Sequence, residues 1–148
     1  MKLVRGDELL EMDAGKFEVL LSSYEALWLD IGTGDGRFVY DQARANPTVL
    51  CAGFDPAWKN MSRVSGRALR KKTAAPNALF LQGTIEEPPV ELRGRAGAVS
   101  INYPWSGLLR ALVSPDPAVL KNNRSLTHSG TVISVYLHMH VFEDEGVK

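Results

Sequence analysis

An apolar segment that leads into a loop with glycine at every second position sets the strongest limit on the possible folds of this chain. Its sequence is Leu27-Trp28-Leu29-Asp30-Ile31-Gly32-Thr33-Gly34-Asp35-Gly36-Arg37. A strand followed by a glycine-rich turn and the start of a helix is a typical cradle for a nucleotide cofactor. Glycine suits such a turn because the backbone can approach a ligand without a Cβ in the way. We therefore predict a cofactor site at this loop.

The spacing of the glycines indicates which kind of cofactor. The third glycine comes one residue earlier than in the dinucleotide motif G-x-G-x-x-G, and Arg37 takes its place. The spacing acid-x-G-x-G-x-G instead resembles the S-adenosylmethionine loop of class I methyltransferases. Asp30 suits that use, because a carboxylate can bind the positively charged amino group of the cofactor. A plain glycine turn in an α/β domain stays open as the alternative.

The length and composition favour one globular domain with its own core. The chain has 148 residues and a formal net charge of zero, so total charge gives no argument for a nucleic-acid partner. The charges are uneven, however, because residues 56–85 contain six bases and no acid. The single cysteine, Cys51, excludes an internal disulfide. With no signal peptide or membrane-spanning run in the sequence, we expect a cytoplasmic protein without a membrane partner.

Hydrophobic periodicity predicts five core strands that alternate with helices. We expect a hairpin in residues 1–12, strands at 27–31, 49–54, 78–81, 98–101 and 130–137, and helices at 17–24, 37–45, 58–71, near 108–112, and at 118–123. This order predicts a single α/β domain over residues 1–148, in which a mostly parallel sheet carries helices on both faces. The tail, residues 143–148, is expected to be frayed.

Four polar positions fall at the ends of four different predicted strands. They are Asp30, Asp55, Glu86 and the segment that begins with Asn102. Ligands of parallel sheets bind at the C-terminal ends of the strands, so these positions are expected to share one edge. Asp55 lies 25 residues beyond Asp30, where an acid can hydrogen-bond the ribose hydroxyls of a nucleoside.

Three segments in this order and spacing, Asp30–Arg37, Gly53–Pro56 and Tyr103–Leu109, resemble the aminoglycoside-resistance 16S rRNA methyltransferases. The resemblance runs from about residue 1 to residue 137. It implies a Rossmann-like class I fold that uses S-adenosylmethionine and releases S-adenosylhomocysteine. It also implies methylation of N1 of a decoding-site adenine, adenine 1408, of 16S rRNA in the 30S subunit. We expect a monomer that works without a metal.

The resemblance also implies a role for each matching residue. The methionine portion of the cofactor would be held by Asp30, Gly32, Thr33, Gly34 and Gly36. Asp55, followed by Pro56, would bind the ribose; Thr84, Ile85 and Glu86 would frame the adenine ring; Asn102 and Tyr103 would wall the pocket. Trp105 would act in catalysis by stacking on the flipped target adenine. The rRNA phosphates would be bound by Arg63, Arg67, Arg70, Lys71 and Lys72.

The chain departs from the family in two places. After the tryptophan the family usually has glycine and then a small hydroxyl residue, whereas this chain has Ser106-Gly107. The family also continues beyond this length with another helix and two antiparallel strands, so we expect the last strands of the usual seven to be absent and the strand at 130–137 to form an uncovered edge. No second tryptophan follows Trp105 to cover the other face of the base.

These departures leave two alternatives open. One is a shortened, weakly active or inactive remnant that binds cofactor or RNA. The other is a class I methyltransferase with another substrate, such as guanine N7 of tRNA or a small amine. A metal enzyme is not expected, because the one metal-like spacing, His138-Met139-His140 with Glu143, offers too few ligands from a single strand end.

Overall fold

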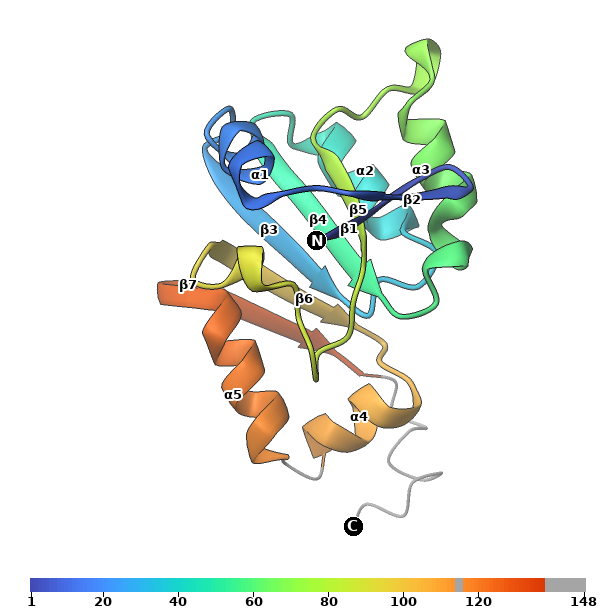
Figure 1. Ribbon diagram of the computed structural model, residues 1–148. Helices are drawn as coiled ribbons and strands as arrows, with labels where there is room; N and C mark the ends of the chain where they lie inside the picture. The colour runs from blue at the N-terminus through green and yellow to red at the C-terminus, as the bar shows by residue number, and fades with distance from the viewer. Residues whose placement is uncertain (114–115, 138–148) are drawn as a thin grey trace.

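A single mixed sheet forms the centre of the computed structural model, which describes residues 1–113 and 116–137 (Figure 1). The strand order in the described residues is β2-β1-β5-β4-β3-β6-β7. The bounds are β1 (Lys2–Arg5), β2 (Glu8–Glu11), β3 (Ala26–Ile31), β4 (Val49–Asp55), β5 (Ala78–Gln82), β6 (Ala96–Asn102) and β7 (Thr127–Tyr136). β3 to β7 run parallel, and the β1–β2 hairpin joins β5 antiparallel. The parallel core, the hairpin and the α/β fold class predicted from the sequence are confirmed.

Helices cover both faces of the sheet, as expected. They are α1 (Ala14–Leu21), α2 (Arg37–Ala45), α3 (Ser62–Ala68), α4 (Ser106–Val113) and α5 (Pro117–Leu126). Buried residues of α1, α4 and α5 pack in one hydrophobic cluster, and those of α2 and α3 pack in a second. In Figure 1 α4 and α5 lie beside β6 and β7, whereas α2 and α3 lie beside β4 and β5. None of the described helices has the length and apolar character needed to span a bilayer.

Alternating side chains along the central strands fill both clusters. In β4, Leu50 and Phe54 belong to the cluster with α1, α4 and α5, whereas Cys51 faces α2 and α3. β5 repeats the pattern, with Leu81 on one side and Phe80 on the other. This period of two is the pleat of a strand buried on both faces. Burial raises the pKa of the Cys51 thiol to about 11, so this cysteine is unreactive, as an apolar strand residue should be.

The prediction of one continuous helix over residues 58–71 is wrong. The segment forms a 3₁₀ turn at Trp58–Met61, then α3, and then a second 3₁₀ turn at Lys71–Thr73. The α-helix ends near Ala68, where the returning chain supplies donors for its last carbonyl groups. The Thr73 hydroxyl donates to the Arg67 carbonyl at 2.7 Å, and the Ala75 amide donates to the Ala68 carbonyl at 3.0 Å.

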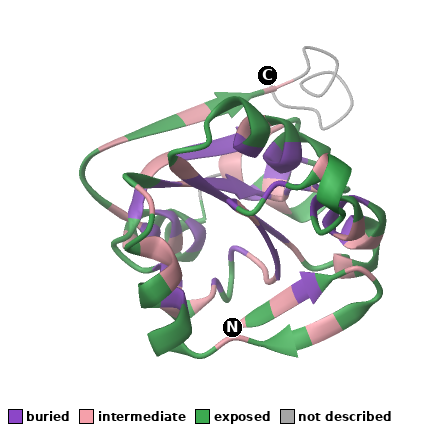
Figure 2. Cartoon of the chain, turned by 90° about the horizontal axis from the view of Figure 1, so that it is seen from above, coloured by how far each residue is buried: buried purple, intermediate pink, exposed green. Residues whose placement is uncertain are grey.

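β7 lies at the edge of the sheet, as predicted for the last strand. It pairs with β6 on one side, and it has no second neighbour among the described residues. Its apolar side chains are largely exposed, with 65% of Val132 and 55% of Tyr136 accessible to solvent. Figure 2 shows this strand mainly in the colours of exposed and intermediate residues.

Candidate functional site

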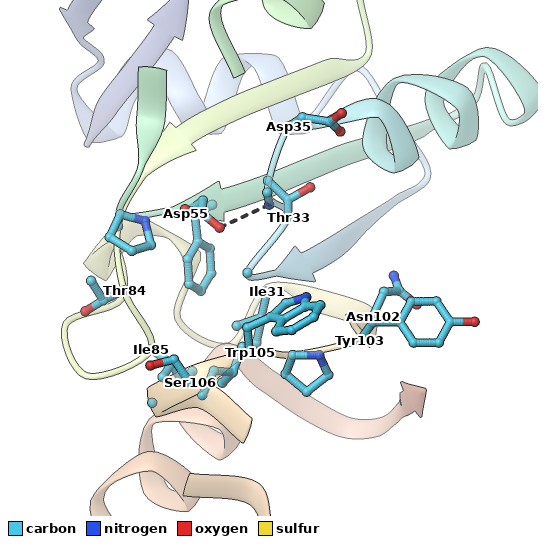
Figure 3. Close-up of a pocket in the computed structure, with 18 of the residues that line it drawn as sticks. Ile31, Thr33, Asp35, Asp55, Thr84, Ile85, Asn102, Tyr103, Trp105 and Ser106 are labelled. Atoms are coloured by element: carbon cyan, nitrogen blue, oxygen red, sulfur yellow. Dashed lines mark hydrogen bonds between the residues drawn. The ribbon is translucent and has the colours of Figure 1, made fainter. Parts of the chain in front are cut away.

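A hollow of about 810 Å³ lies where the loops after β3, β4, β5 and β6 meet (Figure 3). Most of the residues predicted to bind cofactor or base border it: Gly32, Thr33, Gly34, Asp55, Pro56, Thr84, Ile85, Glu86, Asn102, Tyr103 and Trp105. These residues come from four segments separated in sequence. Parallel strands bring them together because their C-terminal ends share one edge of the sheet. Asp30 and Gly36 do not border the hollow.

The glycine loop is folded into a conformation that side chains disfavour. Gly32, Gly34 and Gly36 have φ angles of 71°, 60° and 79°, which lie in the left-handed region. A Cβ on Gly34 would have no heavy atom within 4 Å, so space is open beside the backbone at this point. The loop therefore presents bare main chain to the hollow.

Asp55 fixes this loop to the end of β4. One carboxylate oxygen, Oδ2, accepts a hydrogen bond from the Gly34 amide at 3.0 Å, shown as a dashed line in Figure 3. The other oxygen, Oδ1, accepts from the Ala57 amide at 2.8 Å. Each carboxylate oxygen can accept a second hydrogen bond, so Asp55 still has acceptor capacity for a ligand hydroxyl.

Asp30 lies beneath the loop rather than on the wall of the hollow. It is only 4% exposed, and its Oδ1 accepts from the Ser100 hydroxyl at 2.7 Å and from the Asn102 amide nitrogen at 2.9 Å. Burial raises the pKa of the Asp30 carboxyl, and the surrounding hydrogen bonds only partly offset this effect. A positive charge brought close to Asp30 would favour its ionised form. The predicted interaction with a cofactor ammonium group thus remains a prediction with an electrostatic reason.

Gly36 has a packing role in the described structure. It is the N-cap residue of α2, and a Cβ there would lie 2.8 Å from Cε1 of the Phe80 ring. The close approach of this loop to β5 explains why glycine is required. Gly36 does not line the hollow, so the structure offers no support for its predicted contact with the cofactor.

A strained turn carries Trp105 at the rim. Tyr103 and Ser106 have φ angles of 48° and 50°, both in the left-handed region. Such conformations cost about 1–3 kcal/mol each and are concentrated at functional sites. Trp105 is 79% exposed, and its indole lies beside the hollow in Figure 3. The Tyr103 phenol points away from Trp105 and Asp55 in Figure 3, although the residue itself borders the hollow.

The strain at Ser106 shows the structural consequence of having Ser106-Gly107 where the family usually has glycine followed by a small hydroxyl residue. Glycine adopts a left-handed φ without the steric cost that serine bears. The usual order, glycine before the hydroxyl residue, would therefore relieve this position. Gly107, which follows, has no positive φ and belongs to α4, where glycine gives no such advantage.

The predicted RNA-binding residues lie outside the first hollow. Arg63, Arg67, Arg70, Lys71 and Lys72, here called the basic cluster, are all exposed and border a second hollow. Of the residues that the structure describes, only Asp35 and Arg37 border both hollows. The structure thus places the basic cluster beside the candidate site and joins the two through the start of α2.

Several residues that border the first hollow were not predicted from the sequence. They are Ile31, Asp35, Arg37, Phe54, Gly83, Pro104, Ser106, Gly107 and Leu108. Each lies within three residues of a predicted position. Their closeness in sequence to the predicted C-terminal ends of the strands is the signal from which they could have been predicted. The segment His138–His140 and Glu143 lie outside the described residues. Within the described ranges, no group of three or more His, Cys, Asp or Glu side chains could hold a metal ion.

Comparison with known proteins identifies the family. The family model NpmA, described as 16S rRNA (adenine(1408)-N(1))-methyltransferase, matches residues 2–148. The chain belongs to this family. A curated 16S rRNA (adenine(1408)-N(1))-methyltransferase from Streptoalloteichus tenebrarius is 34% identical over 144 residues, which cover 96% of this chain and 66% of that protein. One from Escherichia coli is 27% identical over 124 residues, covering 82% of this chain and 57% of the relative.

Solved structures of family members agree with the fold. The antibiotic-resistance methyltransferase Kmr is 38% identical with a TM-score of 0.88, covering 92% of this chain and 66% of its own. A W203A mutant of the enzyme from Catenulisporales acidiphilia, solved with cosubstrate SAM, is 34% identical with a TM-score of 0.92, covering 96% of this chain and 70% of its own. The chain spans slightly less than two thirds of the length of the first curated relatives it matches.

Proposed function

We propose that this chain transfers a methyl group from S-adenosylmethionine to N1 of adenine 1408 of 16S rRNA in the 30S subunit, and thereby confers aminoglycoside resistance. The chain belongs to this methyltransferase family, and one structural observation carries the proposal: two elements of the predicted site border the same hollow. A glycine loop tied down by Asp55 and an exposed indole, Trp105, border the same hollow. We further propose that residues 1–148 act as one cytoplasmic domain and as a monomer.

The residues present fit S-adenosylmethionine. The open space beside Gly34 gives a ligand access to bare main chain, and the buried Asp30 carboxylate would be stabilised by an ammonium group. We propose that the glycine loop and Asp30 hold the methionine portion. Asp55 and Pro56 would hold the ribose, and Thr84, Ile85 and Glu86 the adenine ring. When bound, the cofactor supplies an activated methyl group.

The residues of this chain act mainly by positioning the target base. Adenine N1 has a free lone pair, so no side chain has to remove a proton before the methyl group is transferred. Trp105 would stack on the flipped adenine and hold N1 in line with the methyl group, and such alignment can supply much of the rate. Its aromatic face also stabilises the positive charge that develops on the base.

RNA contacts must offset the cost of extruding the base. Unstacking a nucleotide costs a few kcal/mol, and five exposed cations beside the hollow offer phosphate contacts that act independently of base identity. The basic cluster therefore contributes to RNA binding and takes no part in the methyl transfer itself. This division predicts that cofactor binding and RNA binding can be lost separately.

Two measurements test the proposal. Titration calorimetry with S-adenosylmethionine reports cofactor binding by the folded chain. Incubation of small ribosomal subunits with methyl-labelled cofactor, followed by reverse transcription, reports transfer, because N1 methylation blocks Watson–Crick pairing and stops the transcriptase. We expect binding and a stop adjacent to adenine 1408.

Other outcomes point to the alternatives. Cofactor binding without methylation of any subunit would indicate a binding remnant, whereas methylation of tRNA or a small amine alone would indicate another substrate. No cofactor binding by folded protein would refute every methyltransferase assignment. In a host that expresses the chain, we expect raised resistance to kanamycin and apramycin.

A further inference from the structure

The junction between the two hollows is formed by a single ion pair. Asp35 and Arg37 border the first hollow, and they also border the second hollow with the basic cluster. The second hollow has a volume of about 810 Å³, and its other lining residues include Asn60 and Thr73. This pair is therefore the part of the described chain that the two hollows share.

Arg37 is held in place while most of its donors stay available. Its Nε donates to Asp35 Oδ2 at 2.7 Å, and its backbone amide donates to Asp35 Oδ1 at 3.0 Å. Its two Nη groups have no hydrogen-bond partner in the part of the chain that the structure describes. Guanidinium Nη groups suit the paired oxygens of a phosphate group.

This ion pair is a poor device for stabilising the fold. The Arg37 side chain is 75% exposed and that of Asp35 is 46% exposed, and exposed pairs contribute little to stability. What the pair does achieve is orientation, because fixing Nε restricts the rotamers of a long side chain. Asp35 thus acts on Arg37 and has no need to touch a ligand itself.

Arg67, by contrast, is partly engaged within the protein. Its guanidinium carbon lies 4.9 Å from the centre of the Tyr40 ring, and Arg44 approaches the same ring at 5.7 Å. The Tyr40 hydroxyl donates to the Thr73 carbonyl at 2.9 Å, so this stack supports the 3₁₀ turn that carries Lys71 and Lys72. Arg37 has no such internal contact to an aromatic ring among the described residues.

We propose that Arg37 binds the backbone phosphate next to the flipped nucleotide, with Asp35 as its positioning residue. The inference rests on the proposed function. A base that rotates out of its stack turns about its own backbone, so the flanking phosphates stay at the mouth of the pocket that receives the base. Arg37 is the one Lys or Arg side chain among the described residues that border this pocket, and it continues the basic cluster up to the rim.

The salt dependence of RNA binding tests this role. Each phosphate contact contributes about 0.7–0.9 to the slope of log Kd against log salt concentration. We expect Arg37→Gln to lower the slope for 30S subunits by about one unit and to weaken binding about three- to tenfold at moderate salt. Arg37→Lys should keep the slope, because it keeps the charge, and still bind more weakly, because it loses the two-pronged geometry. Asp35→Asn should keep the slope and weaken binding.

Arg95→Gln is the matched control. Arg95 also forms an exposed ion pair, with Glu18, but it precedes the N-terminal end of β6, at the opposite edge of the sheet from the hollow. For Arg95→Gln, the slope of log Kd against log salt concentration should equal that of the original chain. A slope for Arg37→Gln that matches Arg95→Gln would overturn the proposed contact while leaving the proposed function intact. Failure of the original chain to bind 30S subunits at all would overturn both.

Discussion

Two glycines of the same loop should lose different properties on substitution by alanine, Gly34 mainly cofactor affinity and Gly36 mainly stability. Gly34 and Gly36 both have left-handed φ angles, of 60° and 79°, so alanine at either position costs about 1–2 kcal/mol of backbone strain. A Cβ at Gly34 would meet nothing within 4 Å, whereas one at Gly36 would lie 2.8 and 2.9 Å from two carbons of the Phe80 ring.

The difference in surroundings sets the expected magnitudes. Phe80 is 3% exposed and packed in the core, so it cannot move away without disturbing its neighbours. Overpacking adds about 1–3 kcal/mol, which gives a loss of about 2–5 kcal/mol for Gly36→Ala and of about 1–2 kcal/mol for Gly34→Ala. Cofactor affinity should show the reverse order, because Gly34 borders the hollow and Gly36 does not, and we expect Gly34→Ala to weaken cofactor binding about tenfold or more.

Urea unfolding and titration calorimetry measure the two effects on the same proteins. Gly94→Ala is the control, because Gly94 also has a positive φ, of 67°, with no atom within 4 Å of a Cβ, and does not border the hollow. It should cost as much stability as Gly34→Ala and leave cofactor affinity unchanged. Equal losses of unfolding free energy for Gly34→Ala and Gly36→Ala would refute the packing account, and an unchanged cofactor affinity of Gly34→Ala would refute its place in the site.

Three further substitutions probe other parts of the structure. Ser106→Gly should raise the free energy of unfolding by about 0.5–1 kcal/mol in a thermal or urea melt, because glycine relieves the left-handed strain at this position. Gly53→Ala should lower it by about 2–4 kcal/mol in the same assay, because its Cβ would lie 2.6 Å from Val39 Cγ2 and 2.8 Å from Thr33. Asp30→Asn should weaken S-adenosylmethionine binding in calorimetry, because it removes the buried negative charge. It should also flatten the pH dependence of stability: the raised pKa of Asp30 contributes stability at low pH that is lost as pH rises through the folded-state pKa.

Each of these has an outcome that would contradict it. A less stable Ser106→Gly variant would show that the serine hydroxyl matters more than the strain. An unaffected Gly53→Ala variant would mean that α2 can shift away from β4 at little cost. For Asp30→Asn, a stability that still falls with rising pH over the same range would assign that titration to another group.

The sequence allowed the strands and the edge that carries the site to be predicted, because both follow from local patterns. The alternation of apolar residues defines a strand, and acids at the ends of parallel strands meet at one edge. The parallel order brings Asp55, Glu86 and the Asn102–Trp105 segment around one hollow, as expected, whereas Asp30 is buried and does not border it. These inferences needed no knowledge of the packing.

The remaining features depend on tertiary contacts that no local pattern records. Pairing of β3 with β6 sets Asp30 opposite Ser100, and this register, rather than the motif, explains why Asp30 is buried beneath the loop. The left-handed φ angles of Tyr103 and Ser106 fall where β6 connects to α4, and no local sequence pattern marks them. The place of Arg37 at both hollows depends on how α2 packs beside α3, which hydrophobic periodicity alone does not specify.

Cofactor binding and methyl transfer by Trp105→Ala, measured on the same protein, test whether this indole holds the flipped adenine. Because the side chain is 79% exposed, its removal should leave the fold intact, and S-adenosylmethionine affinity should stay within about twofold of the original. Methyl transfer to 30S subunits should be lost, and Trp105→Phe, which keeps an aromatic face, should retain part of it. Undiminished methylation by Trp105→Ala, or loss of cofactor binding together with methylation, would contradict the account of an indole that holds the flipped adenine.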